Sequence, residues 1–164
     1  MCRVFIIGNS GAARECYWLL DDMRKSEAVL ERGITFEGFL SWRDFPGNLK
    51  GLSHLERGDA EAFAPQPEDA FVIGIGSPAL RQEIYTLMKA RGGEFFTLCH
   101  PLAAINPHAR IGEANIFQRN STVFCDAVLG NANYLNGAVN LSHDAVVGDY
   151  NFFGPFFLVL GEAR

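Results

Sequence analysis

The sequence predicts an α/β domain with a parallel sheet, followed by a short solenoid of parallel strands. Apolar runs alternate with helical patterns over the first hundred residues, which is typical of a parallel sheet covered by helices. Beyond that point an apolar residue recurs at every sixth position, and a repeat of this kind indicates a solenoid. We therefore expect an N-terminal domain over residues 1–100 and a solenoid of about three coils over residues 101–164.

The composition fits a chain that buries a sizeable core and does not bind nucleic acid. Of the 164 residues 48% are hydrophobic, and 14 basic against 19 acidic side chains give a net charge of -5. Neither a basic stripe nor an apolar window of membrane-spanning length occurs. The N-terminus lacks the pattern of a secretory signal, and the four cysteines are scattered without CxxC spacing. We expect a cytoplasmic protein with reduced thiols and no membrane partner.

The chain opens with a predicted strand, a glycine turn and a helix. Residues 3–7 form a buried-strand pattern that ends at Gly8, and the turn places free backbone N–H groups where an anion can bind. The turn matches the dinucleotide motif GxGxxG only in part, because Ser10 and Ala13 occupy the second and third glycine positions. The second strand, residues 34–40, also closes without the acidic residue of NAD enzymes, so NAD binding is disfavoured. The apolar face of the helix comprises Cys16, Leu19, Leu20 and Met23.

The rest of the first domain contains one well-defined helix. Residues 41–67 are polar and predict loops around a short strand or helix. Residues 70–75 predict a buried strand, after which Ser77 caps a helix that begins at Pro78. Residues 94–99 predict a further strand. The apolar face of the helix and its glycine stop comprise Leu80, Ile84, Leu87, Gly92 and Gly93.

The six-residue repeat fits a chain that turns a corner after each short strand, with three strands in one triangular coil. The fourth residue after each apolar position is usually small, as expected for an inward-pointing site beside a corner. Gly112, Gly130 and Gly148 recur at 18-residue intervals, so residues 18 apart should stack. The periodic apolar residues are Ile105, Ile111, Phe117, Val123, Leu129, Leu135, Leu141, Val147, Phe153 and Val159.

The last coil is predicted to carry an apolar surface. Phe152, Phe156 and Leu158 fall at outward positions, and Phe153 and Phe157 at inward ones. A solenoid needs a cap at each end, and the sequence predicts none at its C-terminal end, which we expect to be incomplete. An exposed patch of this kind is typical of an interface or of an incomplete domain.

Among the histidines, His143 has a context that suggests chemistry. It lies two residues after Leu141, at a predicted corner, with Asp144 beside it. Histidine can act as a general base near neutral pH and an acidic neighbour can orient it, although an isolated pair at a corner can equally be plain surface. Stacking places Gly161 one coil above, where its backbone N–H could face an oxyanion. No two histidines are close in the sequence, so we expect no metal site.

Four segments carry a resemblance to a known family: IIGNSGAARE, FVIGIGSPALRQEI, FFTLCHPLAAINPHARIG and LNGAVNLSHDAVVGDY. They are similar to sugar acyltransferases of the PglD and NeuD type, which join a small Rossmann-like domain to a left-handed parallel β-helix of hexapeptide repeats. The resemblance implies transfer of an acetyl group from acetyl-CoA to an amine or hydroxyl of a sugar, commonly nucleotide-linked. It also implies a homotrimer with the active site between neighbouring subunits.

The resemblance assigns a role to each candidate residue. His143 is the general base, Asp144 its acidic neighbour, and the Gly161 N–H holds the thioester oxyanion. Asn136 contacts the substrate. The residues implied for the nucleotide of the sugar are Gly8, Asn9, Ser10, Gly11, Gly74, Gly76 and Ser77.

The sequence also departs from the family pattern. Ser10 and Ala12 replace the glycine and the histidine of the usual GxGGH turn. Phe152 replaces a second histidine, and Phe156 and Phe157 occupy positions of small residues on the path of the pantetheine arm. The family's further coils, which grip the rest of CoA, have no counterpart here. The alternative function is therefore a non-catalytic sugar-nucleotide-binding or assembly module that keeps the fold but lacks a complete CoA site.

Overall fold

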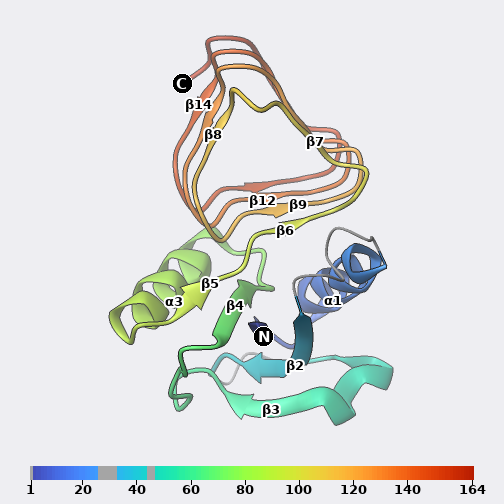
Figure 1. The fold of residues 1–164 in the computed structure, drawn as a ribbon, viewed down its shortest axis with the longest axis vertical. Helices are drawn as coiled ribbons and strands as arrows, with labels where there is room; N and C mark the ends of the chain where they lie inside the picture. The colour runs from blue at the N-terminus through green and yellow to red at the C-terminus, as the bar shows by residue number, and fades with distance from the viewer. Residues whose placement is uncertain (1, 26–32, 44–46) are drawn as a thin grey trace. The chain divides into compact units, whose positions relative to one another are not determined.

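The chain forms two compact units, Met1–Phe96 and Thr97–Arg164. The computed structural model describes residues 2–25, 33–43 and 47–164. The first unit contains a parallel sheet with helices, and the second is a stack of three-sided coils (Figure 1). The predicted fold class is therefore confirmed: an α/β domain is followed by a short parallel β-helix. No helix within the described ranges has the length and apolar character that a membrane span requires.

The first unit is built on a five-stranded parallel sheet in the order β3-β2-β1-β4-β5. β1 is central because it is buried from Val4 to Ile7 and pairs with both β2 and β4. The strand order reverses between β1 and β4, and ligands of open α/β sheets usually bind beyond the carboxyl ends of the strands at such a point. The strands are β1 (Cys2–Ile7), β2 (Ile34–Ser41), β3 (Glu56–Asp59), β4 (Asp69–Ile73) and β5 (Glu94–Phe95).

Among the described residues of this unit, α1 (Gly11–Arg24) packs on β1 and α3 (Pro78–Ala90) packs on β4. The predicted apolar face of α1 is buried in full. In α3 the Ser77 hydroxyl accepts a hydrogen bond from the Leu80 N–H, which confirms the predicted cap. The predicted apolar face of α3 is wrong in part, because Leu80 and Leu87 are only half-buried while Arg81 and Met88 are fully buried.

Arg81 is fully buried, and its guanidinium binds backbone carbonyl groups at the end of β4 and just after it. Its Nη1 donates to the carbonyl oxygens of Ile73 at 2.8 Å and Ile75 at 2.9 Å. Ile73 is the last residue of β4, and Ile75 lies in the segment that leads from β4 to α3. The arginine thus fixes the path of the chain at the edge of the sheet that carries the candidate nucleotide site.

The polar stretch after β2 contains a short 3₁₀ helix, η1 (Lys50–Leu55), that leads directly into β3. The single strand predicted over residues 94–99 is instead divided between two ladders. β5 pairs with β4 in the first unit, whereas β6 (Leu98–Cys99) pairs with a strand of the β-helix. The sequence pattern missed this division because both short strands carry apolar residues and no glycine or proline separates them.

The second unit consists of two-residue strands that stack in three parallel sheets. Residues 18 apart in the sequence pair directly, as Val123 does with Leu141, so the predicted stacking is confirmed. The sheets are β16-β13-β10-β7, β14-β11-β8 and β15-β12-β9-β6. The strands after β6 are β7 (Ala104–Ile105), β8 (Arg110–Ile111), β9 (Ile116–Phe117), β10 (Thr122–Val123), β11 (Val128–Leu129), β12 (Tyr134–Leu135), β13 (Asn140–Leu141), β14 (Val146–Val147), β15 (Phe152–Phe153) and β16 (Leu158–Val159).

The predicted periodic residues form the core of the β-helix. Those of the middle coils, from Phe117 to Leu141, are fully buried, and those of the end coils are partly buried. Small residues at the fourth position also point inward, and six of them are at most 1% exposed: Asn115, Ser121, Ala127, Asn133, Val139 and Ala145. The Oδ1 of Asn115 accepts from the N–H of Asn133, and the Oδ1 of Asn133 from that of Asn151, both at 2.8 Å. These three asparagines form an internal ladder.

One residue at each corner of the later coils adopts a left-handed backbone conformation, with φ between 53° and 63°. Most L-residues avoid this region, and none of these residues is glycine, so the sequence did not indicate it. The corner residues are Ala114, Asn120, Asp126, Ala132, Ala138, Asp144, Tyr150, Phe156 and Glu162.

The last coil exposes large apolar side chains. Phe156 is 84% exposed and Leu158 54% exposed, so the predicted outward positions are confirmed. Phe157 was predicted inside, yet it is 50% exposed. Its ring packs against Phe153, with ring centroids 5.3 Å apart, and within residues 97–164 no further coil covers its other side.

Candidate active site

His143 and Asp144 form a hydrogen-bonded pair at the corner that follows β13. The imidazole Nδ1 lies 2.9 Å from the Oδ2 of Asp144, and both side chains are more than half exposed. Asp144 is the left-handed residue of this corner, with φ 59°, a conformation that aspartate tolerates better than most residues. The bend thus places the carboxylate beside the ring of the preceding residue.

This pairing determines which imidazole nitrogen can act as a base. An ionised carboxylate only accepts hydrogen bonds, so the Nδ1 that faces Asp144 carries the proton. The Nε2 then keeps its lone pair and can remove a proton from a substrate. The pair therefore has the arrangement of a general base with its orienting acid.

Gly161 lies one coil above His143 and directly against its ring. The Glu162 N–H donates to the carbonyl oxygen of His143 at 3.1 Å, which fixes the two coils together. A Cβ added at Gly161 would lie 2.8 Å from both Nε2 and Cε1 of the imidazole. Only glycine therefore leaves room for the ring in this position. Within residues 97–164 no backbone acceptor takes the Gly161 N–H.

A polar cavity of about 390 Å³ lies beside this pair, lined by Asp144, Glu162 and Arg164. Glu162 was not predicted as a site residue, although stacking at 18 residues places it above Asp144. Cys125, which stacks below His143, was also missed; its carbonyl oxygen accepts from the Asp144 N–H at 3.2 Å. Within the described parts of the chain, no three His, Cys, Asp or Glu side chains gather as metal ligands.

Asn136 lies on a different side of the coil from His143. It follows β12, which belongs to the sheet β15-β12-β9-β6, whereas His143 follows β13 of another sheet. Its Oδ1 accepts from the Gly137 N–H at 2.8 Å, and the residue is half-buried. A single chain does not bring Asn136 into contact with the pair.

In the first unit, Gly8 and Gly74 lie against each other at the carboxyl ends of β1 and β4. Gly8 has φ +123°, and a Cβ there would lie 2.7 Å from the carbonyl oxygen of Gly74. A Cβ at Gly74 would in turn lie 2.8 Å from the Cα of Ala13. The two predicted nucleotide segments thus meet at the reversal of strand order, and both glycines are required for the close approach of the backbones.

The other residues predicted to bind the nucleotide lie in less constrained positions than Gly8 and Gly74. Ser10 is the N-cap of α1, but its hydroxyl makes no capping hydrogen bond. Gly11 begins that helix, and a Cβ there would meet only the Arg14 side chain at 3.8 Å. Gly76 is half-buried in the segment before α3, while Ser77 is exposed and caps that helix.

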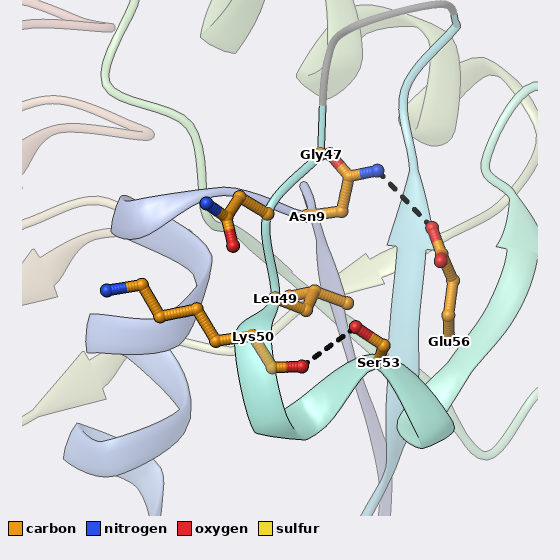
Figure 2. Close-up of a pocket in the computed structure, with 7 residues that line it drawn as sticks. Asn9, Gly47, Leu49, Lys50, Ser53 and Glu56 are labelled. Atoms are coloured by element: carbon orange, nitrogen blue, oxygen red, sulfur yellow. Dashed lines mark hydrogen bonds between the residues drawn. The ribbon is translucent and has the colours of Figure 1, made fainter.

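A second cavity, of about 410 Å³, lies next to Asn9 and was not predicted (Figure 2). Most of its lining comes from the polar stretch after β2, which carried no recognisable motif. The Asn9 Nδ2 donates to the Oε1 of Glu56 at 3.3 Å, and the Asn48 N–H donates to the Asn9 carbonyl oxygen at 2.7 Å. The lining residues are Asn9, Gly47, Asn48, Leu49, Lys50, Ser53 and Glu56.

Comparison with known proteins relates this architecture to sugar acetyltransferases. No protein-family model matches the chain. It is 28% identical over 119 residues to UDP-N-acetylbacillosamine N-acetyltransferase of Bacillus subtilis (strain 168), a match that covers 71% of this chain and 51% of that protein. The chain therefore spans about half the length of this curated relative.

Solved structures of similar fold include two acetyltransferases. The acetyltransferase domain of PglB from Neisseria gonorrhoeae FA1090 matches with a TM-score of 0.77 and 19% identity, over 94% of this chain and 72% of that chain. A variant of perosamine N-acetyltransferase from Caulobacter crescentus, in complex with CoA and GDP-perosamine, matches with a TM-score of 0.78 and 22% identity, over 94% and 70%. These matches confirm the predicted resemblance: the chain is similar to the hexapeptide-repeat sugar N-acetyltransferases of the PglD and PglB type, with a left-handed β-helix.

Proposed function

We propose that this chain is an acetyl-CoA-dependent N-acetyltransferase that acts on a nucleotide-linked amino sugar. The observation that carries the proposal is the His143–Asp144 pair packed beneath Gly161. The relatives support the choice of substrates, since one is named as a UDP-sugar N-acetyltransferase and another was solved with CoA and GDP-perosamine. Because both are N-acetyltransferases, we favour an amine over a hydroxyl as the acceptor.

The proposed reaction uses the free nitrogen of His143. The amine nitrogen of the sugar attacks the thioester carbon of acetyl-CoA, and Nε2 accepts a proton from that nitrogen. The C–N bond forms, the C–S bond breaks, and the proton passes from Nε2 to the departing CoA thiolate. The Gly161 N–H donates to the oxyanion of the tetrahedral intermediate, and Asp144 stabilises the transient imidazolium.

The nucleotide of the sugar binds to the first unit in this proposal. Gly8 and Gly74 bring two backbone segments together at the carboxyl ends of β1 and β4, the usual ligand site of such a sheet. The N-terminus of α1 begins at Gly11 and favours a phosphate. Asn9 connects this turn to the cavity of about 410 Å³.

We further propose that the chain works as a homotrimer. The β-helix exposes large apolar side chains, among them Phe124 at 47% and Val146 at 39%, and such surfaces favour subunit contacts. Asn136 and His143 follow strands of different sheets, so a contact of Asn136 with substrate at His143 requires a neighbouring subunit.

A direct test incubates the protein with acetyl-CoA and either UDP- or GDP-linked amino sugars, and detects the acetylated product by mass spectrometry. The proposal predicts product formation and a rise in melting temperature with acetyl-CoA, because a ligand of the native state stabilises it. Binding of nucleotide sugars without acetyl transfer would support the alternative of a non-catalytic module. Absence of any CoA binding at millimolar concentration would contradict the enzymatic proposal.

A further inference from the structure

The cavity next to Asn9 has the size and the polar lining of a small-molecule site. Its volume of about 410 Å³ falls within the range of roughly 300–1,000 Å³ that is usual for ligand pockets. Asn9 immediately follows Gly8, so the cavity adjoins the turn at which the proposed function places the nucleotide. Both a carboxylate, Glu56, and an amine, Lys50, line it (Figure 2).

Asn9 is buried in the wall of this cavity and is held in place by hydrogen bonds. It is only 8% exposed, its carbonyl oxygen is held by the Asn48 N–H, and its Nδ2 donates to Glu56. Its Oδ1 is buried and has no hydrogen-bond partner among the described residues. Buried acceptors of this kind are rare in native proteins and call for a donor from a ligand or a water molecule.

Glu56 presents a carboxylate that the protein itself uses only in part. The residue begins β3 and is exposed, and its Oε1 accepts from Asn9 at 3.3 Å, a long hydrogen bond. Within residues 2–25, 33–43 and 47–164, no cation pairs with Glu56, and its Oε2 accepts no hydrogen bond. An ionised carboxylate can accept two parallel N–H groups, one on each oxygen.

A free carboxylate discriminates between nucleobases. Guanine offers two adjacent donors, N1–H and N2–H, that match the two carboxylate oxygens. Uracil offers a single N–H between two carbonyl oxygens, and cytosine offers its amino group next to an acceptor nitrogen, so both place an acceptor against the carboxylate. A site built for a donor pair rejects bases that lack it.

We propose that Glu56 reads the base of the nucleotide and that the cavity takes guanine, so that the sugar substrate is linked to GDP. This inference rests on the proposed function, because it requires the nucleotide to bind at the Gly8 turn. Glu56 is then a specificity-determining residue, and Asn9 holds its carboxylate in position.

The test compares the affinities of GDP, UDP and CDP for the full chain by isothermal titration calorimetry. We expect GDP to bind at least about 10-fold more tightly than UDP or CDP. Glu56→Gln keeps the size of the side chain and an acceptor for Asn9, but replaces one acceptor oxygen by a donor. It should weaken GDP binding about 10- to 100-fold and leave UDP binding within about threefold.

Glu94→Gln is the matched control, because it removes one exposed carboxylate that does not line the cavity. It should leave the affinities for all three nucleotides unchanged. Equal affinities of the wild type for GDP, UDP and CDP, or unchanged GDP affinity in Glu56→Gln, would overturn the guanine assignment. Neither result would contradict the nucleotide site itself. If none of the three nucleotides binds at millimolar concentration, both the guanine assignment and the nucleotide site of the proposed function are contradicted.

Discussion

The contact between Gly161 and His143 is the most specific feature of the candidate site at the scale of single residues. It explains why a glycine occupies this position although its backbone is not in the left-handed region. The imidazole is more than half exposed, so neighbours other than Asp144 and Gly161 do little to hold it. The position of the ring therefore depends on the absence of a Cβ one coil above.

Gly161→Ala should displace the ring without disrupting the fold. The added Cβ would lie 2.8 Å from Nε2, and the exposed ring can move away into solvent. A shift of about 1 Å at a catalytic group can lower kcat by about 100-fold. The measurements are the rate of acetyl transfer and the NMR chemical shifts of the His143 ring.

Gly154→Ala is the control for this change, because a Cβ at Gly154 would meet no atom within 4 Å. It should alter neither the rate nor the ring shifts. Unchanged His143 shifts in Gly161→Ala would show that the ring does not depend on the glycine.

At the scale of elements, the asparagine ladder and the left-handed corners determine how the coils stack. Asn133 occupies the centre of the ladder: its N–H donates to Asn115, and its Oδ1 accepts both the N–H and the Nδ2 of Asn151. The ladder satisfies backbone N–H groups that the inward turn of the chain would otherwise leave without partners.

Asn133→Ala should destabilise the β-helix by about 1–3 kcal/mol, because it leaves the Asn151 N–H without its acceptor and removes packing from a buried site. Urea unfolding followed by circular dichroism measures the change. Asn140→Ala, at a half-buried strand position, should cost less than about 0.5 kcal/mol. Equal losses for the two variants would contradict a special role of the ladder.

Ala138→Gly should stabilise the chain, contrary to the usual effect of glycine. The φ of Ala138 is 59°, a conformation that costs an L-residue roughly 1–2 kcal/mol. Added flexibility of glycine in the unfolded chain costs about 0.5–1 kcal/mol, so the net gain should be about 0.5–1 kcal/mol. Ala104→Gly, on an exposed strand position, should lower the free energy of unfolding instead, and the same urea titration compares the two. A loss of stability in Ala138→Gly would contradict the expected relief of strain.

At the scale of the whole molecule, strong periodicity made the fold predictable. The repeat of six predicted the inward residues, and the stacking of residues 18 apart predicted that Gly161 lies above His143. α1 and the Ser77 cap also followed from ordinary helix signals. The exposure of Phe157 could not be predicted in this way, because its burial depends on a covering coil rather than on its own position in the repeat.

Features that depend on distant contacts could not be predicted. Arg81 is buried where the carbonyl oxygens of Ile73 and Ile75 accept from its Nη1, and a polar residue gives no pattern signal for burial. The cavity next to Asn9 arises where the stretch from Gly47 to Glu56 folds over the turn after β1. Its residues share no motif, so only the fold brings them together.

The central claim is that His143 acts as the base in acetyl transfer, and its substitution tests this most directly. The measurement is kcat/KM for acetyl transfer to the accepted nucleotide sugar, for the wild type, His143→Gln and the exposed control His108→Gln. Loss of a general base should lower the rate of His143→Gln by about 10²- to 10⁴-fold while acetyl-CoA still raises its melting temperature, and His108→Gln should match the wild type. A His143→Gln variant that transfers acetyl groups at the wild-type rate would contradict the claim.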